Sequence, residues 1–141
     1  MAHPFESIST EDVKTEDHDA SRPLIISLEA NIEPIPKARM THRSKWSKPA
    51  QRSLKYQETL AWLLKKQNPD IQQTHKPLSL RAIFGRSNHR RCDLKNCIAA
   101  VEDALQFSGL IHDDSQIVEY KECRLEKDLR APFIKMEVRE L

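Results

Sequence analysis

The hydrophobic residues of this chain follow two periods in alternation, and the order of those periods limits the folds that it can adopt. Several short runs are apolar at every second residue, which is typical of a strand with one buried face. Two longer runs repeat apolar residues three and four apart, which is typical of an amphipathic helix. The predicted strands are 23–30, 77–85, 116–126 and 132–139, and the predicted helices are 50–67 and 93–107.

This order, β-α-β-α-β-β, predicts a small single α+β domain with a mixed sheet and two main helices. The last two strands are close in sequence, so we expect them to form a hairpin around 127–131. In the second helix, Asp93 is placed to cap the first turn and Gly109 to end the last turn.

Glycine is scarce, and its scarcity excludes whole classes of site. Only Gly85 and Gly109 occur in 141 residues, so the Gly-rich turn of P-loop and Rossmann sites is missing. No apolar run approaches the roughly 18 residues of a membrane span. Residues 1–20 lack the apolar core of a secretory signal. We therefore expect no contact with a membrane.

Charge is distributed unevenly along the chain. Residues 1–21 contain six acids and one base and sum to −5, whereas the whole chain carries +2, so the remaining 120 residues sum to +7. We predict a disordered acidic tail over residues 1–22 and a folded domain over 23–141. The tail either only increases solubility or competes within the molecule for a basic groove.

The positive charge concentrates after the first predicted strand. Between Pro34 and Gln57 there are seven bases and no acid, and nucleic acid is the commonest partner of so basic a surface. The alternative is a basic surface that binds nothing in particular. The seven bases are Lys37, Arg39, Arg43, Lys45, Lys48, Arg52 and Lys55.

The cysteine count is odd, and no secretion signal accompanies it. We therefore expect free thiols in a reducing compartment, and hence a cytoplasmic protein. A zinc site is the less favoured alternative, because the spacing contains no Cys-x-x-Cys pair. Its candidate ligands are His89, Cys92, Cys97, His112 and Cys123.

Carboxylates gather in and just after the second predicted helix. Asp93 and Asp103 belong to that helix, and Asp113 and Asp114 follow the turn at Gly109. If the turn folds back beside the helix, these acids converge and bind a hard cation such as Mg²⁺ or Mn²⁺. Such an ion beside a basic surface suits phosphodiester hydrolysis. In the alternative interpretation, the same acids only cap a helix, form a turn or face solvent.

Residues 90–118 have the sequence RRCDLKNCIAAVEDALQFSGLIHDDSQIV. This segment resembles the signature of the RusA family of Holliday-junction resolvases. The family pattern runs from a basic residue into Asp-x-Asp-Asn, then through Asp-Ala-Leu to Asp-Asp-x-Gln-Ile/Val. Residues 31–60 also resemble the family's proline-containing basic loop and the helix after it. The resemblance covers about 24–138. The matching residues are Arg91, Asp93, Asn96, Asp103, Ala104, Leu105, Asp113, Asp114, Ser115, Gln116 and Ile117.

The resemblance implies a RusA-like fold and a Mg²⁺-dependent endodeoxyribonuclease of bacterial or phage origin that acts on branched DNA. It implies that Asp93 and Asp114 are metal ligands, with Asp113 and Asp103 as supporting acids. A homodimer is implied as well, and two symmetric cuts suit the two-fold symmetry of a four-way junction.

Two positions depart from the family. Lys95 stands where the family has its second Asp, and Ala99 stands where it has a Lys. In one interpretation Lys95 takes over as the electrostatic stabiliser, because Lys95 and Ala99 are neighbours on one helical face. Glu102 then either replaces the lost ligand or pairs with a base. In the other interpretation the cation weakens metal binding, and the protein binds branched DNA without cutting it.

The resemblance also suggests a role for the basic residues. In this reading Trp46 stacks on an unpaired base at the branch point, and Arg90 and Arg91 hold the strand that is cut. His112 is either a general acid or an ordinary surface histidine. A third hypothesis is an interaction domain that binds no nucleic acid. The residues expected to contact phosphates are Lys37, Arg39, Arg43 and Lys45.

Overall fold

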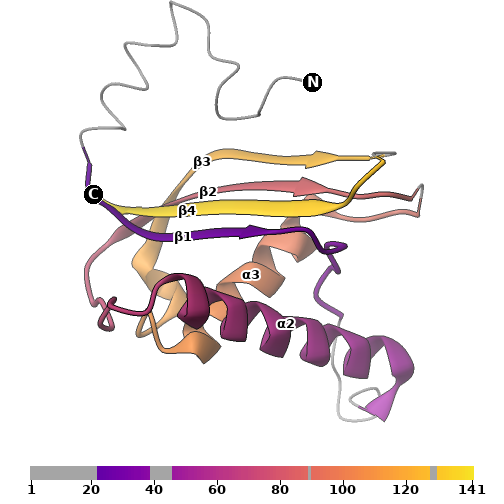
Figure 1. Ribbon diagram of the computed structural model, residues 1–141, viewed down its shortest axis with the longest axis horizontal. Coiled ribbons are helices and arrows are strands. Elements are labelled where there is room, and N and C mark those ends of the chain that lie inside the picture. Colours follow the sequence, from indigo (N-terminus) through magenta and orange to yellow (C-terminus); the bar gives the residue numbers. More distant parts are fainter. Residues whose placement is uncertain (1–21, 39–45, 89, 128–129) are drawn as a thin grey trace, which may run out of the picture.

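The computed structural model describes residues 22–38, 46–88, 90–127 and 130–141. They form a mixed four-stranded sheet with two α-helices, in the predicted order (Figure 1). The elements are β1 (Leu24–Ala30), α2 (Lys48–Gln67), β2 (Leu78–Gly85), α3 (Leu94–Ser108), the short 3₁₀ turn η2 (Asp114–Gln116), β3 (Ile117–Glu126) and β4 (Phe133–Glu140). The predicted acidic tail lies almost entirely outside the described residues.

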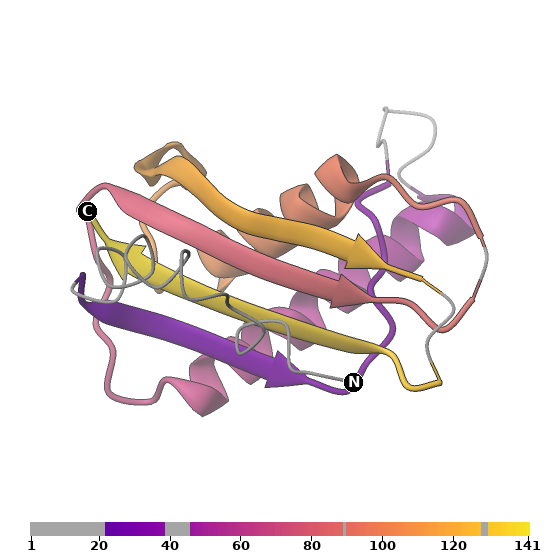
Figure 2. The same ribbon diagram turned by 90° about the horizontal axis from the view of Figure 1, so that it is seen from above.

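The strands lie in the order β1-β4-β2-β3, as Figure 2 shows from above. β2 pairs with β3 in parallel and with β4 in antiparallel, and β1 pairs with β4. The predicted hairpin between the last two strands is therefore wrong, because β2 lies between them. β3 follows β2 through α3, and such a crossover sets two strands parallel and side by side. The other edge of β2 is left for β4.

Both helices cover the same face of the sheet (Figure 1). The side chains of Leu78, Leu80, Ala82 and Phe84 alternate along β2 and belong to the core that the helices share. From the helices, Leu60 of α2 and Val101 of α3 enter the same core, and neither has exposed surface. The alternation in β2 and the helical spacing in α2 and α3 therefore bury their apolar residues in one layer.

The caps follow the predicted chemistry, with one change in a boundary. α2 begins at Lys48, two residues before the predicted start, because Pro49 fits the first turn of a helix, where its missing N–H would have no partner. Ser47 caps this helix and accepts a hydrogen bond from the Ala50 N–H at 3.3 Å. In α3, Asp93 is the N-cap and Gly109 is the C-cap, as the sequence predicts.

Neither helix of the described part combines the length and the apolarity that crossing a bilayer requires.

We predict that Gly109→Ala lowers the free energy of unfolding by about 1 kcal/mol, because Gly109 has a left-handed φ of 79° that a Cβ disfavours. No heavy atom lies within 4 Å of where that Cβ would stand, so the cost is conformational and not a steric clash. Urea unfolding measures it. Gly109→Asn is the matched variant and is expected to lose less, since Asn tolerates this conformation. Equal losses for both variants would contradict the explanation.

Candidate functional site

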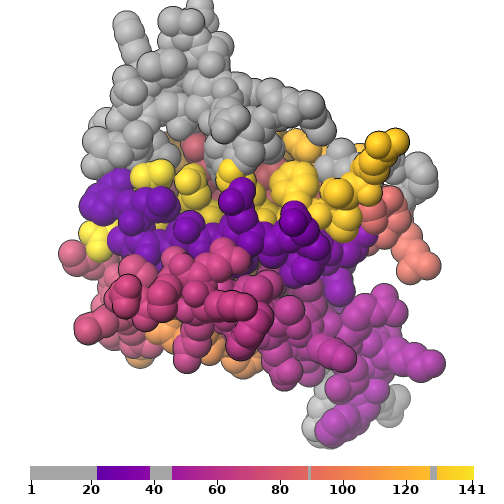
Figure 3. Space-filling model, viewed as in Figure 1, coloured from indigo at the N-terminus to yellow at the C-terminus, as the bar shows by residue number. Residues whose placement is uncertain are grey.

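The N-terminal end of α3 opens into a groove in which bases outnumber acids, and we call it the arginine groove. Its volume is about 640 Å³. In Figure 3 the surface is hollowed at the right, between the magenta first turns of α2 and the salmon segment above them. The charged residues of its lining are two acids, Glu33 and Asp93, and five bases, Lys37, Arg52, Arg86, Arg90 and Arg91.

The segment after β1 is fastened to both helices, and this fastening carries its charged residues to the groove. The backbone N–H of Lys37 donates to the carbonyl oxygen of Asn96 in α3 at 2.9 Å. The N–H of Ala38 donates to Oγ of Ser53 in α2 at 3.2 Å. One wall of the arginine groove is thus held by hydrogen bonds to two separate elements.

Asp93 lines the arginine groove as the cap of α3. Its Oδ1 accepts a hydrogen bond from the backbone N–H of Lys95 at 3.1 Å. Arg90 and Arg91 precede it and are exposed. A helix N-terminus carries a partial positive charge, which adds to the charge of the arginines. This end of α3 therefore has the electrostatic character of an anion site.

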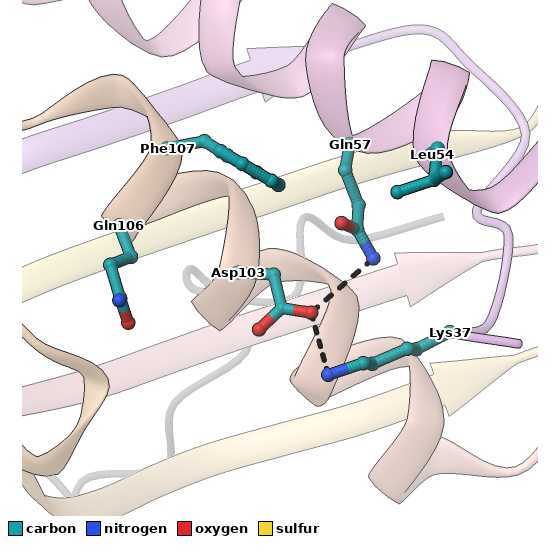
Figure 4. A pocket seen from close by; sticks show the side chains of 6 residues that line it. All are labelled: Lys37, Leu54, Gln57, Asp103, Gln106 and Phe107. Atoms are coloured by element: carbon teal, nitrogen blue, oxygen red, sulfur yellow. Dashed lines mark hydrogen bonds and ion pairs between the residues drawn. The ribbon is translucent and has the colours of Figure 1, made fainter. Parts of the chain in front are cut away.

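Asp103 and Lys37 form an ion pair (Figure 4). The Nζ of Lys37 lies 2.7 Å from Oδ2 of Asp103, and Nε2 of Gln57 donates to the same oxygen at 3.4 Å. They line a second pocket of about 350 Å³, together with Leu54, Gln106 and Phe107. Lys37, predicted to contact phosphate, therefore pairs with Asp103, predicted to support the metal site.

Asp113 and Asp114 form the turn after α3. Asp113 caps η2 in a capping box with Gln116 and also accepts a hydrogen bond from the Ser115 hydroxyl. These bonds from Ser115 stabilise its charged form and lower the pKa of its carboxyl. The N–H of Asp114 donates to Oε1 of Gln106 at 3.2 Å, which fastens the turn to α3.

Glu102 faces β3 from the middle of α3. The hydroxyl of Tyr120 donates to its Oε2 at 2.5 Å. Burial raises the pKa of Glu102, and the nearby negative charges of Asp114 and Asp103 raise it further. Glu102 therefore pairs with a tyrosine in place of a base, and it shares its surroundings with two of the predicted metal-binding acids.

The predicted acids do not meet at one point within the described part of the chain. Asp114 contacts Gln106, which lies about 20 Å along the helix axis from Asp93 at roughly 1.5 Å per residue. The turn at Gly109 folds back beside the C-terminal half of α3 only. No group of three or more His, Cys, Asp or Glu side chains is arranged to hold a metal ion among the described residues.

The predicted DNA contacts fall partly in and partly outside the described residues. Lys37, Arg90 and Arg91 line the arginine groove. Trp46 lies just before α2 and is 75% exposed. The other three, Arg39, Arg43 and Lys45, lie outside the described ranges.

The sequence prediction misses Arg86, and it names Arg52 only as one of the seven bases of the basic segment, not as a phosphate contact. Arg86 directly follows Gly85, the last residue of a wholly buried strand that has a parallel neighbour. The carboxyl ends of parallel strands are the usual place of ligand sites in α/β sheets. That placement is the signal that could have found Arg86, whereas the signal for Arg52 is its place in the acid-free basic run between Pro34 and Gln57.

The two departures from the family pattern lie in the first half of α3. Lys95 is exposed in the first turn, and Ala99 lies one turn further on and is half-buried. The ring of His112 lies 4.8 Å from that of His75, measured between centroids. His112 is thus placed beside η2, on the C-terminal side of α3.

The cysteines are free thiols. The sulfur atoms of Cys92 and Cys97 lie 3.0 Å apart and are buried, while Cys123 directs its thiol toward the carbonyl of Leu80 at 3.8 Å. Of the other zinc candidates, His112 stacks near His75, and His89 lies outside the described residues. These positions do not gather the cysteines into one cluster.

The comparison with known families decides the relationship of this chain. The family model described as Endodeoxyribonuclease RusA matches residues 31–139. The chain belongs to the RusA family. No curated protein gives a significant match to it.

The RusA match runs from the end of β1 to the end of β4, so it contains both helices and the arginine groove. Membership of the RusA family points to an endodeoxyribonuclease that acts on Holliday junctions in recombination. RusA nucleases generally depend on a divalent metal. The matched span also contains Lys95 and Ala99, where this RusA chain departs from the pattern.

We predict that Glu102→Gln raises the melting temperature at pH 7–8 and leaves it unchanged near pH 4. The raised pKa means that the fold favours the protonated carboxyl, so wild-type stability falls as the pH rises through that pKa. Gln stays neutral and keeps an oxygen for the Tyr120 hydroxyl. Circular dichroism melts across this range measure the effect. Glu58→Gln, on the exposed side of α2, is the charge-matched control. A lower melting temperature for Glu102→Gln at pH 8 would contradict the prediction.

Proposed function

We propose that this chain is an endonuclease that resolves Holliday junctions or other branched DNA by symmetric phosphodiester cleavage with Mg²⁺ or Mn²⁺. The observation that carries the proposal is the arginine groove at the start of α3 in a chain of the RusA family. Five bases against two acids in one concave site favour a polyanion.

The groove accounts for affinity to the DNA backbone. Guanidinium groups offer forked donors that match phosphate oxygens, and such contacts position a duplex without reading its sequence. Arg90 and Arg91 are exposed and free to reach a strand at the mouth of the groove. Trp46 lies just before the first turn of α2 with an exposed ring, which can stack on an unpaired base at a branch point.

The proposal includes a metal ion, but its predicted ligands do not come together around one position within a single chain. Carboxylates are suitable ligands for Mg²⁺, and the predicted set is Asp93, Asp114, Asp113 and Asp103. Asp103 is paired with Lys37, Asp113 caps a turn, and Asp93 and Asp114 lie at opposite ends of α3. These residues do not fit a single ion in one chain.

The second candidate function is a branched-DNA-binding protein that has lost cleavage. The observation that favours it is Lys95, an exposed cation in the first turn of α3 beside Asp93. A cation there repels a divalent ion and attracts a phosphate. In the cleaving alternative, Lys95 provides the electrostatic stabilisation that Ala99 lacks. Both candidates include a homodimer, which presents two equivalent surfaces to a two-fold symmetric junction.

We predict paired symmetric nicks in a labelled synthetic four-way junction when Mg²⁺ or Mn²⁺ is present, and none in EDTA. Asp114→Asn is expected to reduce nicking by at least about 100-fold, since even groups that only orient a ligand contribute about 10- to 100-fold. Asp70→Asn removes the same charge at an exposed site after α2 and is the control. Gel electrophoresis of the cleaved strands is the measurement.

The other outcomes separate the candidates. Tight junction binding without nicks in either metal would favour the binding protein, and Lys95→Asp with Ala99→Lys then asks whether cleavage returns. Nicks that survive Asp114→Asn would exclude Asp114 from the metal site. A wild-type protein that neither binds nor cuts the junction would support the interaction domain and overturn both candidates.

A further inference from the structure

Arg86 is a buried cation whose donors are not all used. Only 7% of its surface is exposed, although it lines the arginine groove. Its Nε and Nη1 have no hydrogen-bond partner among the residues that the structure describes. Arg86 forms an ion pair with Glu33, whose Oε2 lies 3.8 Å from Nε, a distance that is too long for a hydrogen bond. A buried guanidinium in this state is strongly disfavoured unless an anion completes it.

Glu33 is itself held in place by other contacts. Its carboxylate accepts a hydrogen bond from the backbone N–H of Ser87 at 3.1 Å and another from the Ser87 hydroxyl. The acid is therefore fastened to the residue after Arg86 and reaches the guanidinium only loosely. Glu33 offsets the charge of Arg86 without satisfying its donors.

The backbone fixes Arg86 at the end of two parallel strands. Its N–H donates to the carbonyl of Glu126, at the end of β3, at 2.8 Å. The N-terminus of α3 and the arginines of the groove surround the same space. A tetrahedral anion with several acceptor oxygens suits such a set of donors better than a planar carboxylate does, and a DNA backbone presents that anion at every nucleotide.

We propose that Arg86 binds a backbone phosphate of the DNA. In the free protein, the carboxylate of Glu33 stands in for that phosphate as the anion beside Arg86. The proposal rests on the proposed function, since the phosphate belongs to DNA lying in the arginine groove. Because Nε and Nη1 are buried in the free protein, the guanidinium has to turn toward the groove when DNA enters. The phosphate then supplies the acceptors that these donors lack, and Glu33 keeps its bonds to Ser87. Glu33 is then an internal competitor, and its negative charge lowers the affinity of the groove for DNA.

The test compares junction binding by four variants in EDTA, so that cleavage plays no part. Arg86→Gln is expected to lower the affinity about tenfold or more and to reduce the slope of log K against log salt by about 0.9, the contribution of one phosphate contact. Glu33→Gln removes the competing charge and keeps an oxygen for Ser87, so it is expected to raise the affinity several-fold. The double variant is expected to resemble Arg86→Gln.

Lys76→Gln is the charge-matched control. Lys76 lies before β2, at the opposite end of that strand from Arg86, and pairs with Glu140. It is expected to leave the affinity and the slope close to those of the wild type. Thermal melts of each variant show that the fold is retained. If Arg86→Gln does not fold, the test uses Glu33→Gln and Arg86→Lys. The lysine keeps the positive charge but lacks the forked donors of the guanidinium.

Failure of this proposal is distinct from failure of the proposed function. A wild-type protein that does not bind the junction overturns the function itself. A wild type that binds, with an Arg86→Gln variant of equal affinity and equal salt slope, shows that Arg86 only fastens the segment after β1. If Glu33→Gln leaves the affinity for the junction unchanged or lowers it, Glu33 does not compete with phosphate for Arg86, and that part of the proposal is overturned.

Discussion

The complete burial of β2 is the constraint on which the rest of the structure depends. All eight residues of Leu78–Gly85 are buried, and the strand is hydrogen-bonded along both edges. A strand of this kind takes the centre of its sheet, because neither edge nor face of it then meets water. Its carboxyl end delivers Arg86, and α3 begins shortly after. The place of the arginine groove is therefore a consequence of where this fully buried strand lies.

The elements could be predicted from the sequence because their signals are local. Alternation in β2, helical spacing in α2 and the caps at Asp93 and Gly109 each depend on a few neighbouring residues, and the structure confirms them. The choice of strand partners is not local. The proximity of 116–126 and 132–139 in sequence suggests a hairpin, but β2 pairs with both strands and lies between them.

Residues of the candidate site could be predicted from the sequence only where their role depends on a few neighbouring residues. Asp93 fulfils the role of a cap, and its place beside the cations follows from it. The pairing of Lys37 with Asp103 joins two residues far apart in sequence, each of which had been predicted for a different ligand. Arg52 comes from α2 and Arg86 from the end of β2, so the local signal of each residue does not reveal that the two line one groove. Groove formation is a property of the packing, which periodicity does not encode.

The dipole of α3 gives its two ends opposite electrostatic demands. The N-terminal end is positive and, with the arginines, favours phosphate. The C-terminal half meets Glu102, Asp103 and Asp114, while the last turn of α3 contains no basic residue. Negative groups there are stabilised by a cation or by a proton. Lys37 supplies a cation to Asp103, and the raised pKa of Glu102 favours its protonated form. The two ends are linked by Lys37, which lines the arginine groove and pairs with Asp103, so a change in the acids of the C-terminal half alters the charge available in the groove.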